Sequence, residues 1–291
     1  MSNTVIYQEA WTTKLQERLD HPTVWKEVCK VEYTDTRVLN NPYVGSAGAL
    51  SFPAVQTHTR GSAYTFQDFT ETSESITIST SAILPIFIDR ADEAQSNYAK
   101  QMYWAERQGQ LIDEKLEAAM LASHADWTNF DNASIGGAAG NITVTSANID
   151  NIIRAIKREI NEANGQKLAA QNGMFIVWRP ADFEILEEFV QANGFATADL
   201  YLKEGIRSGL RYAGVDHYMS NDHTSGHLFA GVKKAYHLGI CRTTYGQVIV
   251  TQDPPATGAG ALSGIGVISR VDYAFKAWSN VKPVLFDVLV N

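Results

Sequence analysis

The chain has 291 residues, 45% of them hydrophobic and 19% charged, a composition that excludes a disordered or fibrous protein and allows one large core or two modest ones. Its net charge of −8 argues against a dedicated nucleic-acid reader, which would carry a basic stripe. The longest apolar run, residues 82–88, is much shorter than the about 20 residues of a membrane helix, and the start shows no secretory signal, so no membrane partner is expected.

The N-terminal part of the chain predicts an arm that contains a short helix. Apolar residues recur there at every fourth position: Trp11, Leu15 and Leu19. This spacing places them on one helical face, and Pro22 would stop the helix.

Residues 38–72 differ in character, since they are rich in Gly, Ser, Thr and aromatic residues and poor in charge. A turn signal lies at residues 59–62; Phe52 and Val55 precede it, and Tyr64 and Phe66 follow it at strand spacing. We interpret this segment as a long β-hairpin with Arg60 and Gly61 near its tip.

A buried strand and a very long helix are predicted next. The apolar run 82–88 indicates a buried strand, and Asp89 is a candidate N-cap for the helix that follows. From residue 90 to residue 123 there is no proline, and apolar or small residues alternate by three and four. This narrow stripe predicts a rod of roughly 45 Å that lies across another surface.

The second half predicts a mixed α/β lobe after a Gly/Ala/Asn-rich linker at 129–141. Amphipathic helices are expected over 149–164 and 183–193, with a buried strand at 174–178 between them. A loop at 194–209 and several short strands follow: around Tyr212, then 227–230, 235–241, 247–251, 265–278 and 281–290. Helices and strands do not alternate regularly, so the predicted class is α+β.

Catalytic chemistry has weak support. Four histidines, with Asp216 and Asp222 nearby, could ligate a metal: His217, His223, His227 and His237. However, residues 221–226 have the composition of a turn rather than a helix, which favours a polar loop. The Gly-rich residues 258–266 precede a strand, whereas a phosphate loop precedes a helix.

The remaining candidate groups also give no clear sign of catalysis or ligand binding. Carboxylates on the long helix, including Asp113 and Glu117, fit a solvated face, and no G-x-S-x-G elbow occurs. Cys29 and Cys241 are expected to be free thiols. We therefore predict no catalytic, metal-ligating or cofactor-binding residue, and a protein that is not an enzyme.

Three passages, in order, carry a resemblance to a known family. They are the run QEAWTTKL at 8–15, the strand-to-helix passage at 76–92 and the run RVDYAFKAW at 270–278. With the order of elements around them, the chain resembles the major capsid proteins of tailed bacteriophages, which have the Hong Kong 97-type capsid fold.

The resemblance implies a division of the whole chain. Residues 1–38 would be the N-terminal arm and 39–72 the extended E-loop hairpin. The peripheral domain would combine 73–142 with 263–291 and carry the spine helix at 90–123. Residues 143–262 would form the axial domain. In some relatives an E-loop lysine forms a covalent bond with an asparagine of another subunit. No lysine occurs between Lys30 and Lys100 here, so that cross-link is not expected.

The resemblance also implies function. The chain would self-assemble into pentamers and hexamers of an icosahedral phage head that encloses double-stranded DNA. It would be assembled in the host cytoplasm, reside in the virion and contact DNA weakly and without base readout. Its partners would be other copies of itself, a portal and a separate scaffolding protein, since the arm is too short for a built-in scaffolding segment.

A lone hairpin is marginal in water, so its apolar side chains should pack against something. We expect it to lie on a neighbouring subunit, with these subunit-contact residues: Phe52, Arg60, Tyr64, Phe66, Asp68 and Phe69. The alternative is that the hairpin folds back onto its own domain. Two alternative functions stay open, an encapsulin-like compartment shell and, below it, a metal-dependent hydrolase that uses the 212–245 region.

Overall fold

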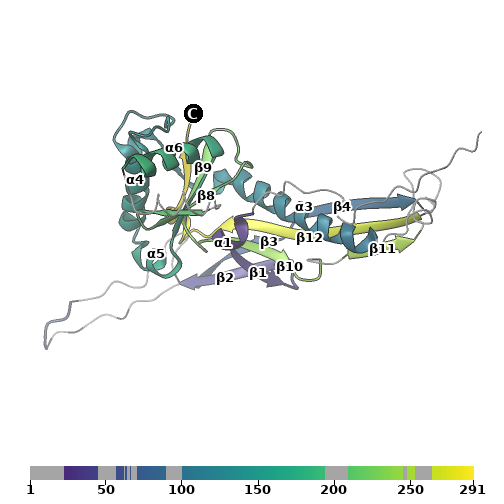
Figure 1. The fold of residues 1–291 in the computed structure, drawn as a ribbon. Coiled ribbons are helices and arrows are strands. Elements are labelled where there is room, and N and C mark those ends of the chain that lie inside the picture. Colours follow the sequence, from purple (N-terminus) through teal and green to yellow (C-terminus); the bar gives the residue numbers. More distant parts are fainter. Residues whose placement is uncertain are drawn as a thin grey trace, which may run out of the picture.

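The computed structural model describes residues 23–44, 57–61, 63, 66, 71–89, 100–193, 209–244, 248–252 and 264–291. These residues form a lobe that holds α4, α5 and α6 and an elongated lobe along α3, β4 and β12 (Figure 1). Helices and sheets are mixed without regular alternation, which confirms the predicted α+β class. The helix expected near Trp11, the expected helix residues 90–99 and most of the loops at 194–209 and 253–264 lie outside the described residues.

A six-stranded mixed sheet forms the centre of the first lobe. Its strand order is β5 (Thr128–Phe130), β13 (Leu285–Leu289), β9 (His227–Val232), β6 (Met174–Trp178), β8 (Val215–Met219) and β7 (Gly209–Tyr212). β6 is almost entirely apolar, as a central strand covered on both faces requires, and its last four residues are buried.

Three helices belong to this lobe: α4 (Ile149–Glu162) and α5 (Gln166–Asn172) pack against β9, and α6 (Pro180–Ala192) packs against α4. The isoleucines of α4 recur at helical spacing and are all buried: Ile149, Ile152, Ile153, Ile156 and Ile160. The predicted helices around α4 and α6 and the predicted strand at β6 are confirmed, whereas α5 and β8 were not predicted.

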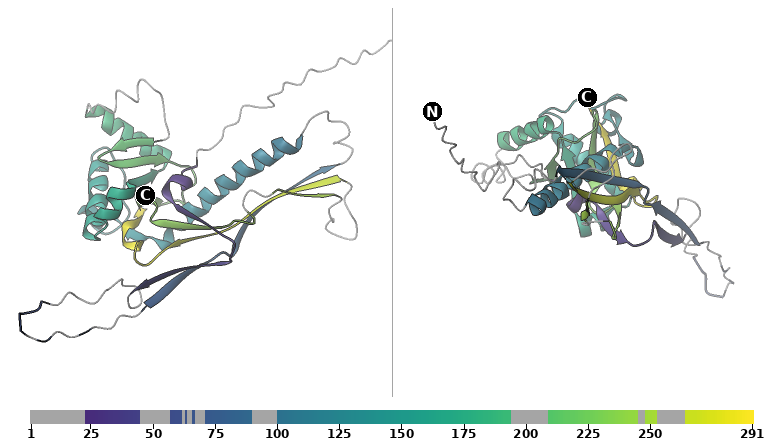
Figure 2. Two further views of the ribbon diagram at one scale, coloured as in Figure 1. Left: turned by 90° about the horizontal axis from the view of Figure 1, so that it is seen from below. Right: turned by 90° about the vertical axis from the view of Figure 1, so that its right-hand side faces the viewer.

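The elongated lobe contains a second sheet. Its strands are β1 (Lys30–Thr34), β10 (Tyr236–Cys241), β12 (Gly264–Ala277) and β11 (Val248–Gln252), and β4 (Thr80–Asp89) also pairs with β12. α3 (Lys100–Ala122) lies along one face of this sheet (Figure 2, left). Gln108 of α3 fixes that position, because its amide donates to the carbonyls of Leu84 and Val267, both at 3.1 Å.

Two short elements precede the hairpin and were not predicted. α1 (Trp25–Val28) packs on α3, and β1 pairs in parallel with β10. The backbone N–H of Val24 donates to the carboxylate of Glu117, which is fully buried. The expectation that Glu117 lies on a solvated face is therefore wrong, because the N-terminal segment covers that end of α3.

The predicted linker at 129–141 is structured in part. β5 pairs in parallel with β13, and the 3₁₀ helix η2 (Asn132–Ile135) follows it. The Asp131 carboxylate accepts hydrogen bonds from the backbone N–H groups of Ala133 and Ser134 and so caps η2. A further 3₁₀ helix, η3 (Lys282–Val284), precedes β13.

A two-stranded antiparallel sheet of β2 (Val38–Val44) and β3 (Glu71–Thr77) leaves the main body (Figures 1 and 2). Its base packs on its own chain, since Leu39 and Ile76 lie over Gly239 of β10, where a Cβ atom would stand 3.1 Å from Leu39. Polar bonds add to this anchor, because Glu74 accepts from Ser279, and Lys276 donates to the Ser75 carbonyl at 2.8 Å. The base of the hairpin is thus held in one orientation.

Candidate subunit-contact surface

One face of the elongated sheet is covered by the hairpin base at β10 and is left largely exposed, within the described residues, where β4, β12 and β11 pair. We call this the outer face and define it by Ile83, Pro85 and Phe87 of β4, Ile268 of β12 and Ile249 of β11. Residues of one strand alternate between faces, and the register aligns Pro85, Ile268 and Ile249 across three strands. Ile83, Phe87 and Ile249 are 53%, 40% and 49% exposed.

On the opposite face α3 covers β4 and β12, whereas Val250 of β11 is 54% exposed there. This opposite face carries Ser269, whose hydroxyl donates to the Gln108 side chain at 2.6 Å, and Val267, which is 1% exposed. The prediction of a buried strand at 82–88 is therefore wrong for Ile83 and Phe87. An apolar run predicts cover on both faces, and a single copy of the chain supplies one cover, α3.

The structure describes two of the six predicted contact residues, Arg60 and Phe66, and both belong to the hairpin. Arg60 and Gly61 form a turn, and Gly61 has a φ of 94°, a left-handed conformation that favours glycine. Arg60 is exposed, and Phe66 is 87% exposed. The other four lie outside the described residues: Phe52, Tyr64, Asp68 and Phe69.

The four histidines near residue 220 do not form one site. His217 is buried in β8 and accepts a hydrogen bond at 2.9 Å from the indole N–H of Trp178. His237 lies in β10 beside Trp278, and His223 lies in the loop after β8. Burial lowers the pKa of each of these three imidazoles to about 4.

His227 lies apart from the other three, in β9, where its Nδ1 contacts Asp287 at 2.9 Å. The expectation of a polar loop therefore holds for His223, whereas His217, His227 and His237 lie in strands. This dispersal removes the basis for a metal-dependent hydrolase built from these four residues. Cys29 and Cys241 are free, as predicted.

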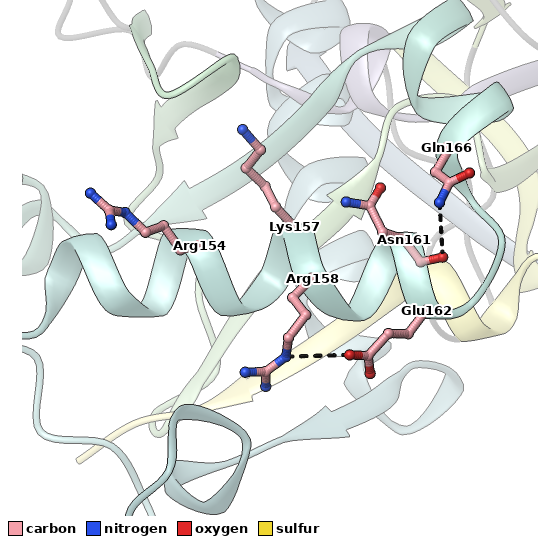
Figure 3. Close-up of a pocket in the computed structure, with 6 residues that line it drawn as sticks. All are labelled: Arg154, Lys157, Arg158, Asn161, Glu162 and Gln166. Atoms are coloured by element: carbon pink, nitrogen blue, oxygen red, sulfur yellow. Dashed lines mark hydrogen bonds and ion pairs between the residues drawn. The ribbon is translucent and has the colours of Figure 1, made fainter.

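A shallow, open pocket of about 450 Å³ lies on the exposed side of α4 (Figure 3). Six residues line it: Arg154, Lys157, Arg158, Asn161, Glu162 and Gln166. Arg158 pairs with Glu162 at 3.7 Å, and Lys157 donates to the carbonyl of Ala213 at 2.7 Å. Glu162 and Asp150 partly neutralise Arg158 and Arg154, and the Ala213 carbonyl occupies a donor of Lys157, so the pocket suits loose electrostatic contact better than tight anion binding.

No helix within the described ranges combines the length and the hydrophobicity that crossing a bilayer requires.

Comparison with known proteins finds chains of similar structure. No family model and no curated protein matches the sequence. A chain of Mycobacterium phage Che8 aligns with a TM-score of 0.67 at 14% identity, over 98% of each chain. The capsid chain of an empty GTA particle gives 0.65 at 12% identity, over 98% of this chain and 95% of that one. The capsid chain of Ralstonia phage GP4 gives 0.62 at 11% identity, over 100% and 99%. The chain therefore has the fold of phage capsid proteins, as the resemblance implied.

Proposed function

We propose that the chain is a major capsid subunit that forms the pentamers and hexamers of an icosahedral phage head around double-stranded DNA. The observation that carries this proposal is the match in fold to capsid chains over nearly the full length of both partners. In this proposal it acts as a structural protein of the virion, assembles in the host cytoplasm and works with a portal and a separate scaffolding protein.

The outer face supports assembly on physical grounds. Ile83, Phe87 and Ile249 each expose about half of their surface on one sheet face. Apolar side chains gathered on one surface of a soluble protein commonly mark an interaction site. We propose that another copy of the chain covers the outer face. Each such contact can be modest, because a shell subunit makes several at once.

The hairpin is the element that we propose as the cover. Its base is anchored by Leu39, Ile76 and Glu74 on its own body, while Arg60 and Phe66 are exposed. An anchored base fixes the direction in which the tip points, so a copy placed by symmetry would meet it at one defined site. In this arrangement residues 39–72 act as the E-loop.

The remaining division of the chain is proposed in the same terms. Residues 1–38 form the N-terminal arm, 73–142 and 263–291 the peripheral domain with its spine helix at 90–123, and 143–262 the axial domain. The sheets cross these bounds, because β10 and β11 pair in the elongated sheet, whereas β5 and β13 pair in the six-stranded sheet. The net charge of −8 favours weak contact with packaged DNA, because repulsion between the shell and the phosphates opposes tight binding.

Electron microscopy of the purified full-length chain, expressed alone and with a candidate scaffolding protein, tests the proposal. We expect closed, uniform particles under at least one of these conditions. Particles filled with a protein cargo instead of DNA in infected cells would favour a compartment shell. A stable monomer under every condition would contradict both.

A further inference from the structure

Three potential metal ligands from distant parts of the chain meet beside the end of α3. His124 begins the 3₁₀ helix η1 (His124–Asp126), His227 begins β9, and Asp287 lies in the middle of β13. Asp287 Oδ2 is 2.9 Å from His227 Nδ1 and 3.7 Å from His124 Nδ1. One ligand atom of each residue lies within 4.8 Å of the other two.

The Asp287 carboxylate is buried and faces two imidazoles. Asp287 is 2% exposed, so its carboxylate has little access to solvent. A buried carboxylate is costly unless a cation or hydrogen bonds compensate its charge. The nearest nitrogens to it are Nδ1 of His227 and Nδ1 of His124, which are both potential metal ligands.

The geometry is close to that of a zinc site. Zinc binds imidazole nitrogen and carboxylate oxygen at about 2.0–2.1 Å, which places tetrahedral ligand atoms about 3.3–3.4 Å apart. The distances of 2.9 Å and 3.7 Å lie on either side of that value. The two histidine rings are stacked with centroids 3.7 Å apart and must rotate for both nitrogens to face one ion. Their side chains are 29% and 24% exposed, which leaves room for that rotation and for a water ligand.

We propose that His124, His227 and Asp287 bind a divalent transition-metal cation of the zinc class. Two imidazoles and one carboxylate favour Zn²⁺, Co²⁺ or Ni²⁺ over the hard cations Mg²⁺ and Ca²⁺. The sequence predicted no metal site, because only one of these residues lies in the histidine-rich region. The inference does not depend on shell assembly.

The bound cation would cross-link two parts of the fold. η1 follows directly from α3, the helix of the elongated lobe, whereas β9 and β13 belong to the six-stranded sheet of the other lobe. A metal shared by these elements joins the end of α3 to that sheet. Because the ion binds the folded arrangement in preference to the unfolded chain, it raises the stability of the fold.

Cobalt(II) is a suitable probe, because it occupies zinc sites and has a visible absorption band that reports its coordination. We expect titration of the full-length chain with Co²⁺ to saturate at one ion per chain. Zn²⁺ should displace the ion, and a large excess of Mg²⁺ should not. His124→Ala and Asp287→Asn should each weaken Co²⁺ binding at least tenfold. His58→Ala, at an exposed histidine of the hairpin turn, and Cys241→Ser should bind as the wild type does.

Thermal unfolding gives a second readout, which remains informative if a variant is less stable than the wild type. Zn²⁺ should raise the unfolding midpoint of the wild type by several degrees and leave that of His124→Ala unchanged. Absence of saturable Co²⁺ binding would overturn the proposal. Equal binding or an equal Zn²⁺-dependent shift in wild type and His124→Ala would overturn it as well.

Discussion

Ser220 donates a hydrogen bond at 2.7 Å to the buried carboxylate of Glu117 and so joins the loop after β8 to the C-terminal part of α3. The same carboxylate accepts from the backbone N–H of Val24. One side chain of α3 thus holds both the N-terminal segment and the six-stranded lobe. The relative placement of these three parts depends on a buried polar contact rather than on apolar packing alone.

Glu117→Ala should destabilise the fold, because it leaves the donors at Val24 and Ser220 without their acceptor. Each unsatisfied buried donor costs about 1–3 kcal/mol, so we expect a loss of roughly 2–5 kcal/mol in the free energy of unfolding. Denaturant unfolding measures it. The matched control is Glu114→Ala, at a partly exposed carboxylate on the same helix, which should change stability by about 0.5 kcal/mol or less. Equal losses in the two variants would contradict this role for Glu117.

Acid should weaken the fold through His217. Burial lowers the pKa of its imidazole to about 4, whereas the unfolded chain has a pKa near 6.5. Between these values the unfolded state binds a proton that the folded state does not, so stability falls as the pH falls from about 6.5 to 4. The full shift corresponds to about 3 kcal/mol for this one group.

His217→Asn tests that assignment, because the Asn side-chain oxygen can accept the bond from Trp178 and does not titrate. Unfolding midpoints measured from pH 7.5 to 4.5 should fall less steeply in this variant than in the wild type. The same slope in both proteins would show that other groups carry the acid sensitivity.

Phe87→Glu should block assembly and leave the subunit folded. Phe87 is 40% exposed in one chain, so a charge there costs little until a neighbour covers it. Burial of an unpaired carboxylate at the contact would cost several kcal/mol. Sedimentation should show loss of particles, and circular dichroism should show an unchanged fold.

The matched control for Phe87→Glu is Tyr33→Glu, at a side chain of similar exposure, 45%, on β1. This variant should assemble as the wild type does. Normal particles from Phe87→Glu would show that the outer face is not a contact.

Arg60→Glu should lower the yield or stability of particles more than the stability of the subunit. Arg60 lies in the exposed turn of the hairpin, next to Gly61 with its left-handed φ of 94°. A change of charge at an exposed turn normally alters folding stability by less than about 0.5 kcal/mol. Particle yield, set beside the circular dichroism of the unassembled variant, separates the two effects. An unfolded Arg60→Glu subunit would contradict a role confined to assembly.

Local sequence patterns predicted the elements in which the spacing of apolar residues alone shows which side chains are buried. The isoleucines of α4, from Ile149 to Ile160, and the apolar run of β6 each identify an element without help from the rest of the chain. The long stripe of α3 likewise indicated a helix across another surface, and Lys100–Ala122 is helical. The whole-chain resemblance then supplied the fold that the structural comparison bears out.

Long-range partners explain what sequence reasoning missed. β1 pairs with β10, some two hundred residues away, and its five residues are too few for the alternation of Val31 and Tyr33 to identify a strand alone. Glu117 looked solvent-exposed because its partners, Val24 and Ser220, come from distant segments. The outer face looked buried, because an apolar run indicates cover and does not say whether the same copy provides it.

The most direct test of the account is a cryo-electron microscopy map of assembled particles in which the surroundings of Ile83, Phe87 and Ile249 can be traced. We predict that the hairpin of a neighbouring copy lies over these three side chains and that Arg60 is at or near the contact. Particles in which the outer face is bare, or in which each hairpin lies on its own subunit, would contradict it.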